Sequence, residues 1–217
     1  MELDYALVKF NNINIHTREG VKLRGYFANK YKEQELMHNH IEDKLIFSYP
    51  KVQYKIIQNN PIICGILEGA KIVSKVAVET DELNLSGKVY EAFEKEIIRK
   101  KVEFGLYNDY IEYEFLTPWI ALNQNNIERY RVAKQIEREE LMKKILIGNI
   151  ISLSKGMEYT VEDTVYSWVD LKETIVKFKN IEMTAFKGRF RTNFNIPDYL
   201  GLGKAVSRGF GTILRVK

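Results

Sequence analysis

The sequence predicts an α+β protein of two tandem ferredoxin-like, or RRM-like, domains. Over the first half, strand-like alternation and helix-like stretches follow the order strand, helix, two strands, helix, strand. Around residues 107–110 the pattern restarts with a strand, a long amphipathic helix and further alternating segments. This element order is that of the split βαβ ferredoxin-like unit. We therefore expect one such domain over residues 1–108 and a second over residues 109–217.

Each expected element has a local signal. Alternation of apolar and polar residues predicts strands, and apolar residues three or four positions apart predict helices. In the first half, the elements are a strand over residues 3–15, a helix from Thr17 as N-cap to about Tyr31, strands over 45–57 and 61–66 joined by a turn at 58–60, a helix over 68–78 and strands through 88–104. In the second half, they are a strand over 111–117, one helix over 127–153, strands over 174–178 and 181–194, and a closing strand within 209–216.

Composition indicates a globular protein with an uneven charge. Hydrophobic residues make up 45% of the 217, but no apolar run approaches the roughly 20 residues that cross a bilayer. The start of the chain lacks a secretory signal pattern, so we expect a cytoplasmic protein with no membrane partner. Cys64, the single cysteine, lies in an apolar run and is expected to be buried and inert. Residues 172–217 hold 10 Lys or Arg against 3 Asp or Glu, which favours a polyanionic partner for this end of the chain.

The segment Gly201–Gly211 is the strongest local signal. Two Gly-x-Gly pairs, Gly201 with Gly203 and Gly209 with Gly211, bracket Lys204, Ser207 and Arg208. Glycine permits positive φ and lets another chain approach closely, so a loop of this kind suits backbone amides that face phosphates. It matches neither the Walker pattern nor the dinucleotide fingerprint. The alternative is a glycine-rich hairpin or bulge with no ligand.

His38 and His40 form a second signal. They lie one residue apart in a polar stretch after the first expected helix, where a site residue can face solvent on a rigid scaffold. Two solvated loop histidines are the plain alternative. A metal site with Glu42 and Asp43 is a weaker one, because the spacing matches no familiar zinc pattern.

Two histidines fit the chemistry of internal RNA cleavage. The reaction removes a proton from a 2′-hydroxyl, protonates the 5′ leaving oxygen and stabilises added charge at phosphorus. A group with a pKa near 6.5 serves as base or acid, each transfer contributing about 10² to 10⁴-fold. A phenol such as that of Tyr49 could orient or protonate an oxygen.

A basic strand face is predicted beside the glycine loop. Lys187, Arg189 and Arg191 alternate, so all three point to one side of the expected strand. We interpret that side as an RNA-backbone contact, the alternative being a solvated sheet surface.

The glycine loop Gly201–Gly211, followed by a short closing strand, resembles the signature of the CRISPR-associated repeat-processing endoribonucleases, the Cas6 family. The stretch from His38 to Lys55 also resembles members of that family, in which a histidine after the first helix is the usual catalytic residue. The resemblance implies tandem ferredoxin-like domains and cleavage of precursor CRISPR RNA within each repeat. It also implies a 2′,3′-cyclic phosphate product, a 5′-hydroxyl and no cofactor or metal.

Carried onto this chain, the resemblance gives His38 or His40 the role of general base or acid, with Tyr49 a weaker catalytic candidate. Repeat RNA is the implied partner, and other CRISPR effector subunits or a homodimer are compatible with it. The expected RNA-binding residues are Lys187, Arg189, Arg191, Gly201, Gly203, Lys204, Ser207, Arg208, Gly209 and Gly211. A non-catalytic repeat-RNA-binding subunit and a metal-dependent hydrolase are the alternative functions.

Overall fold

The computed structural model describes residues 1–38, 40–41, 44–45 and 49–216, and for residues 18, 38, 40–41 and 44–45 it describes the backbone alone. Contacts divide the chain into two compact units. The N-terminal unit holds Glu2–Val102 together with Ser207–Gly209. The C-terminal unit holds Met1, Glu103–Val206 and the segment that begins at Phe210.

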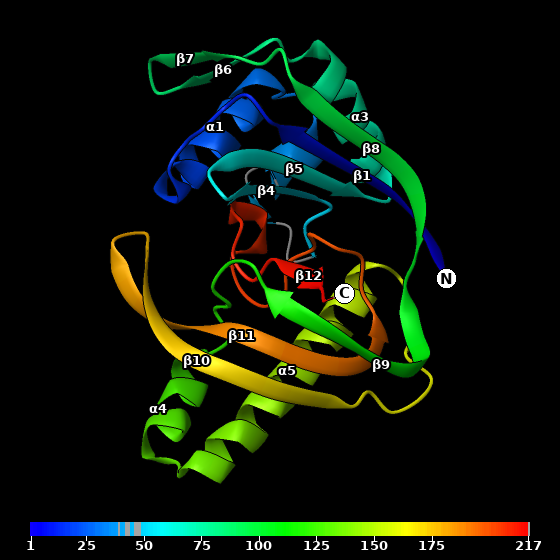
Figure 1. Ribbon diagram of the computed structural model, residues 1–217, viewed down its shortest axis with the longest axis vertical. Helices are drawn as coiled ribbons and strands as arrows, with labels where there is room; N and C mark the ends of the chain where they lie inside the picture. The colour runs from blue at the N-terminus through cyan, green and yellow to red at the C-terminus, as the bar shows by residue number, and fades with distance from the viewer. Residues whose placement is uncertain (39, 42–43, 46–48, 217) are drawn as a thin grey trace. The chain divides into compact units, whose positions relative to one another are not determined.

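The N-terminal unit has a ferredoxin-like sheet (Figure 1). Strand β1 (Glu2–Phe10) pairs antiparallel with β5 (Asn60–Ile66), which pairs antiparallel with β4 (Val52–Ile57). The full order is β4-β5-β1-β8, with β8 covering Lys95–Glu103. The predicted turn between β4 and β5 has positive φ at Gln58 and Asn59, backbone angles that asparagine in turns tolerates.

Helices α1 (Gly20–Lys30) and α3 (Glu68–Glu79) cover one face of this sheet (Figure 1). A short 3-10 turn, η1 (Thr17–Glu19), leads into α1, so Thr17 does not cap the helix. Leu23 and Phe27 of α1 and Val73 of α3 pack with strand residues in one buried core. Small elements complete the described unit: α2 (Glu35–His38), the pair β2 (His40–Ile41) and β3 (Lys44–Leu45), and the hairpin β6 (Glu82–Leu85) with β7 (Lys88–Glu91).

The C-terminal unit repeats the sheet order with one helix missing. Its strands are β9 (Gly105–Phe115), β10 (Ser167–Phe178), β11 (Ile181–Asn195) and β12 (Ile213–Arg215), in the order β10-β11-β9-β12. Where a ferredoxin-like unit has its second helix, this unit has an irregular segment over residues 196–212 that contains the 3-10 turn η2 (Val206–Arg208). The predicted class, α+β with two tandem ferredoxin-like domains, is confirmed.

The prediction of a single helix over residues 127–153 is wrong, because the helical region starts earlier and is broken in two. The structure has α4 (Gln124–Val132) and α5 (Gln135–Gly156), separated by extended backbone at Ala133 and Lys134. The amide of Lys134 donates to the Glu137 carboxylate at 2.8 Å, which starts a new helix. The Arg138 guanidinium donates to the carbonyls of Ala133 and Arg131 at 3.0 Å and 3.0 Å, so it stabilises the end of the first helix.

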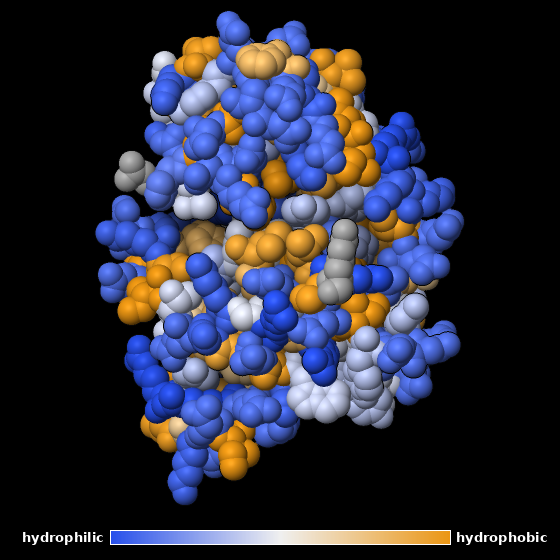
Figure 2. Space-filling model, in the orientation of Figure 1, coloured by the Kyte–Doolittle hydropathy of each residue, from blue (hydrophilic) through white to orange (hydrophobic). Residues whose placement is uncertain are grey.

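Cys64 is buried, and burial raises the pKa of its thiol to about 11, in agreement with the prediction of an inert cysteine. Within the described part of the chain, no helix is long and apolar enough to cross a membrane. On the face that Figure 2 draws, hydrophilic residues predominate and hydrophobic residues form separate groups.

Candidate functional site

The backbone of the two histidines lies in short elements of the N-terminal unit. His38 is the last residue of α2 and His40 the first residue of β2, rather than both lying in a loop. Their side chains, and the alternative metal ligands Glu42 and Asp43, lie outside the described residues. The neighbouring backbone is anchored, because the buried hydroxyl of Tyr54 donates to the carbonyl of Met37 at 3.2 Å. Burial raises the pKa of Tyr54, so its hydroxyl remains a donor.

Tyr49 is half-buried and bonded to a polar side chain on β4. The Gln53 side-chain amide donates to the Tyr49 hydroxyl at 2.7 Å and to the Pro50 carbonyl at 3.2 Å. The Lys55 ammonium, 0% exposed, donates to the Gln53 amide oxygen at 2.7 Å. Burial lowers the pKa of Lys55 to about 8, which the Cys64 thiol nearby opposes only in part.

Three of the four loop glycines pack so closely against the C-terminal unit that a side chain would not fit. A Cβ on Gly201 would lie 2.7 Å from the Cβ of Val206. One on Gly203, where φ is +85°, would lie 2.5 Å from the Trp119 ring nitrogen. Gly211, at φ +62°, faces the backbone carbonyl of Leu202. These three contacts lie within the C-terminal unit, and they support the alternative of a closely packed glycine turn.

The tip of the loop, Ser207–Gly209, belongs to the N-terminal unit. Gly209 has φ +88°, and a Cβ there would lie 2.9 Å from the carbonyl oxygen of Tyr54 on β4. The chain that approaches Gly209 closely is therefore strand β4 of this protein, and not a bound RNA. Tyr54 contacts both the loop tip, through its carbonyl, and the residue before His38, through its hydroxyl.

Arg208 has a second arginine for a neighbour. Its carbonyl oxygen lies against Gly20, where a Cβ would sit 3.7 Å away, and Arg24 follows Gly20 by one helical turn. Burial lowers the pKa of Arg24 and the positive charge of Arg208 lowers it further. The charge of Tyr54 acts in the opposite direction. Two arginines whose positive charges act on each other favour an anion near them. The spacing of Gly20 and Arg24 gave no sequence signal for this pairing.

Lys204 lies in the C-terminal unit and donates to the carbonyl of Leu122 at 3.0 Å, with partial burial lowering its pKa. The residue remains exposed overall. One of its three donors is thus used within the fold, and the others can still reach a phosphate.

Lys187, Arg189 and Arg191 do share one face of β11, as their alternation predicted. Glu112, on the neighbouring strand β9, forms salt bridges with two of them. The Glu112 carboxylate accepts from Arg191 at 3.0 Å and from Arg189 at 3.4 Å. A pocket of about 440 Å³ opens here, lined in part by Trp168.

Exposed aromatic residues on the same face were missed by the sequence analysis. Trp168, 52% exposed, lies opposite Arg191 on β10, and its ring meets that of Tyr110, 48% exposed, at 5.4 Å. Exposed flat rings beside arginines are typical of surfaces that stack unpaired bases. The expected strand began only at residue 174, which left Trp168 outside the predicted sheet.

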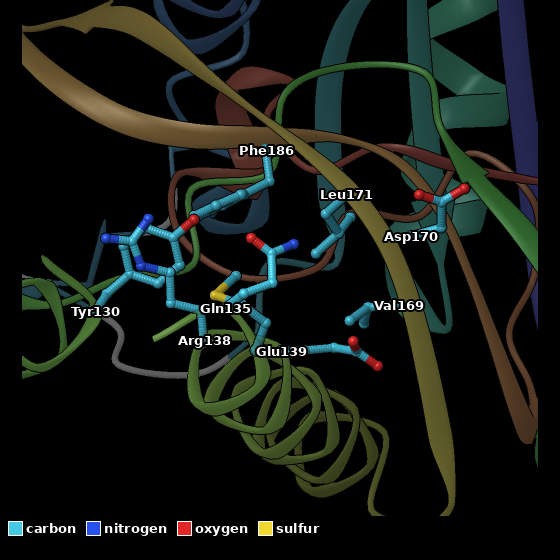
Figure 3. A pocket seen from close by; sticks show the side chains of 9 residues that line it. Tyr130, Gln135, Arg138, Glu139, Val169, Asp170, Leu171 and Phe186 are labelled. Carbon is cyan, nitrogen blue, oxygen red and sulfur yellow. The ribbon is translucent and has the colours of Figure 1, made fainter. Parts of the chain in front are cut away.

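A different pocket, of about 260 Å³, lies between α4, α5 and β10 (Figure 3). Arg138 lies over the ring of Tyr130 at 4.9 Å, and the Tyr130 hydroxyl donates to the Glu173 carboxylate at 3.2 Å. None of the predicted site residues lines it. Over the described residues, no group of three or more His, Cys, Asp or Glu is placed to hold a metal ion.

Family models match both halves of the chain. The model of the Cas6b N-terminal domain matches residues 1–103, and that of the Cas6b C-terminal domain matches residues 105–216. The chain belongs to the Cas6b family. The resemblance to the wider Cas6 family is therefore confirmed, and the two Cas6b matches meet close to the break between the two contact units.

Solved Cas6b structures agree over the whole chain. One crystal structure of Cas6b is 42% identical, covers 100% of both chains and has a TM-score of 0.93. A second, of a CRISPR RNA processing endoribonuclease Cas6b, is 39% identical over 100% of both chains with a TM-score of 0.82. An uncharacterized protein of Methanocaldococcus jannaschii is 40% identical over 146 residues, which are 67% of this chain and 99% of that protein.

Proposed function

We propose that this Cas6b-family chain is a metal-independent endoribonuclease that cleaves precursor CRISPR RNA within its repeats. The products are a 2′,3′-cyclic phosphate and a 5′-hydroxyl. Similarity over the full length to a Cas6b described as a CRISPR RNA processing endoribonuclease supports the class of substrate. The observation that carries the proposal is the position of Tyr54, which packs against Gly209 and bonds to the residue before His38.

The cleavage step needs only groups that this region supplies. The 2′-oxygen attacks the adjacent phosphorus while an imidazole of His38 or His40 takes its proton. The bond from phosphorus to the 5′-oxygen breaks, and that oxygen receives a proton from the other imidazolium or from the Tyr49 hydroxyl. Positive charge near the phosphate stabilises the five-coordinate state.

Arg208 and Arg24 are the proposed phosphate contacts of the N-terminal unit. Guanidinium groups bind phosphate through paired hydrogen bonds, and an anion between two close arginines relieves their repulsion. Lys204, Ser207 and the backbone at Gly201, Gly203 and Gly209 are proposed to contact RNA along the loop. The amide of Gly211 donates to the Pro118 carbonyl at 2.9 Å within the fold, so Gly211 serves the shape of the loop.

The exposed face of the C-terminal sheet is proposed to hold the rest of the repeat. Lys187, Arg189 and Arg191 supply cations, and Trp168 with Tyr110 supplies rings for unpaired bases. Glu112 binds both arginines. Each arginine uses one donor on Glu112, so its remaining N–H groups can still reach a phosphate.

The test uses labelled repeat RNA incubated with the protein in EDTA. A second substrate carries a 2′-deoxy group before the scissile phosphate. We expect cleavage that survives EDTA and disappears with the deoxy substrate. Binding without cleavage indicates the non-catalytic RNA-binding subunit, and activity restored by added metal indicates the metal-dependent hydrolase.

A further inference from the structure

A line of hydrogen bonds runs from a buried lysine to Tyr49. Lys55 donates to the amide oxygen of Gln53 at 2.7 Å, and the amide nitrogen of Gln53 donates to the Tyr49 hydroxyl at 2.7 Å. Lys55 is 0% exposed and Gln53 1% exposed. All three residues lie on or just before β4, within the N-terminal unit.

The direction of these bonds is fixed by chemistry. An ammonium group only donates, so the oxygen of the Gln53 amide must face Lys55. A backbone carbonyl only accepts, so the contact with Pro50 at 3.2 Å requires the amide nitrogen on the opposite side. The Tyr49 oxygen consequently accepts from Gln53, and its own O–H points to a different acceptor.

Fold stability does not explain the buried lysine. Burying an ammonium is costly, and an apolar residue of similar volume is often neutral or stabilising at such a site. The Cys64 thiol, whose negative charge would favour the Lys55 ammonium, stays neutral because burial raises its pKa to about 11. What Lys55 adds beyond packing is a fixed orientation for the Gln53 amide.

We propose that Gln53, oriented by Lys55, positions Tyr49 to donate its hydroxyl proton to the 5′-oxygen that leaves during RNA cleavage. The inference rests on the proposed function and adds two positioning residues to it. As the bond from phosphorus to the 5′-oxygen breaks, the proton passes from the Tyr49 oxygen to that oxygen. The phenolate that remains keeps the hydrogen bond from Gln53, which stabilises its charge.

Gln53→Glu reverses the bond without changing the shape of the side chain. A carboxylate only accepts, so it still binds Lys55 but takes the Tyr49 proton as a hydrogen bond. We expect single-turnover cleavage to slow by about tenfold or more at saturating RNA. RNA affinity should stay within about threefold, because no phosphate contact is lost. Gln58→Glu, on the exposed turn after β4, adds the same charge and should cleave like the wild type.

A second readout does not depend on cleavage. In protein with 13C-labelled tyrosine, assigned with Tyr49→Phe, the carboxylate of Gln53→Glu should raise the pKa of Tyr49 by about one unit or more. An unchanged Tyr49 titration overturns the proposed bond direction. Wild-type protein that fails to cleave in EDTA counts against the proposed function alone, since this titration still tests the bond.

Two further variants complete the test. Tyr49→Phe should lose about as much rate as Gln53→Glu, and a Tyr49→Phe enzyme as fast as the wild type overturns the proposal. Lys55→Met removes one of the two bonds that orient the Gln53 amide and leaves the bond to Pro50, so its rate should fall between those of the wild type and Gln53→Glu. If Gln53→Glu unfolds at a lower temperature than the wild type, the cleavage rate of Lys55→Met is the deciding measurement. A Lys55→Met enzyme that cleaves as fast as the wild type overturns the positioning role.

Discussion

The hydroxyl of Tyr54 donates to the carbonyl of Met37 at 3.2 Å, and the carbonyl of Tyr54 lies against Gly209. A single buried residue thus contacts both the end of α2 and the tip of the glycine loop. A loop without glycine at 209 could not approach β4 this closely.

His40→Ala should abolish cleavage and leave RNA affinity within about a few-fold, because it removes a proton-transfer group and no phosphate contact. Single-turnover cleavage and filter binding on the same repeat RNA measure the two effects. Unchanged cleavage removes His40 from the mechanism. A parallel loss of binding would instead indicate that the imidazole holds the RNA.

Arg208→Ala should weaken RNA binding and flatten its salt dependence. For single-stranded RNA, each lost phosphate contact lowers the slope of log affinity against log salt by about 0.7. Arg24→Ala should give a similar change, and the double variant less than the sum, since both arginines are proposed to share one phosphate. Lys71→Ala, an exposed lysine on α3, is the matched control. A control-like slope for Arg208→Ala argues against the contact.

Trp168→Ala should weaken the binding of repeat RNA by about 1–3 kcal/mol, the usual value of one stacked base. Trp168→Phe keeps a flat ring and should recover part of this loss. The side chain is exposed, so the free energy of unfolding should change little. Equal affinities for the alanine variant and the wild type would leave this sheet face outside the RNA path.

Lys55 predicts a pH dependence of stability. Its pKa is about 8 in the folded protein and near 10.5 when unfolded. Between these values the unfolded chain binds more protons, so the contribution of Lys55 to the free energy of unfolding rises with pH. The gain is about 1.4 kcal/mol for each unit of pKa difference.

Lys55→Met isolates this gain. Relative to that variant, the wild type should become more stable between about pH 7.5 and pH 10 in urea unfolding. Cys64 is present in both proteins, so its own titration cancels. A stability difference that stays flat over this range would mean that Lys55 reaches solvent.

Gly209→Ala should lower the free energy of unfolding by more than about 1 kcal/mol, because φ is +88° and the new Cβ would lie 2.9 Å from the Tyr54 carbonyl oxygen. Gly148→Ala is the matched control. Gly148 lies within α5 with nothing near its Cβ position, so alanine there should stabilise by about 0.5–1 kcal/mol. Equal effects of the two substitutions would remove the packing argument for Gly209.

The sequence predicted most of the fold, because the spacing of apolar residues that marks a strand or a helix can be recognised within a few neighbouring positions. The β4–β5 hairpin and α3 followed from alternation and helical spacing within a few residues of one another. The break at Lys134 was missed, since apolar spacing continues across it from Tyr130 to Ile136. The signal that was present, Glu137 three residues after Lys134, lacks the Ser or Thr that usually marks a capping box.

The site was harder to predict because its partners are distant in the chain. Glu112 meets Arg189 and Arg191 only through the pairing of β9 with β11, 77 and 79 residues away. Gln53 and Lys55 alternate with apolar residues, which predicts a solvent face for them, so no sequence signal indicated that both are buried in a polar network. The roles of His38, His40 and Tyr49 in cleavage stay predictions.

The glycine loop stands where a second helix would stand, and this limits how the chain can adapt to a different RNA. A helix tolerates exchange along its whole outer face, whereas Gly201, Leu202, Gly203, Val206, Gly209 and Gly211 are held by backbone angle or packing. Ala205 has φ +58° and the Phe210 ring packs against Phe178, so only Lys204, Ser207 and Arg208 remain open to exchange. Divergence among relatives that recognise unlike repeats should concentrate at those three positions, leaving the turn around them nearly invariant.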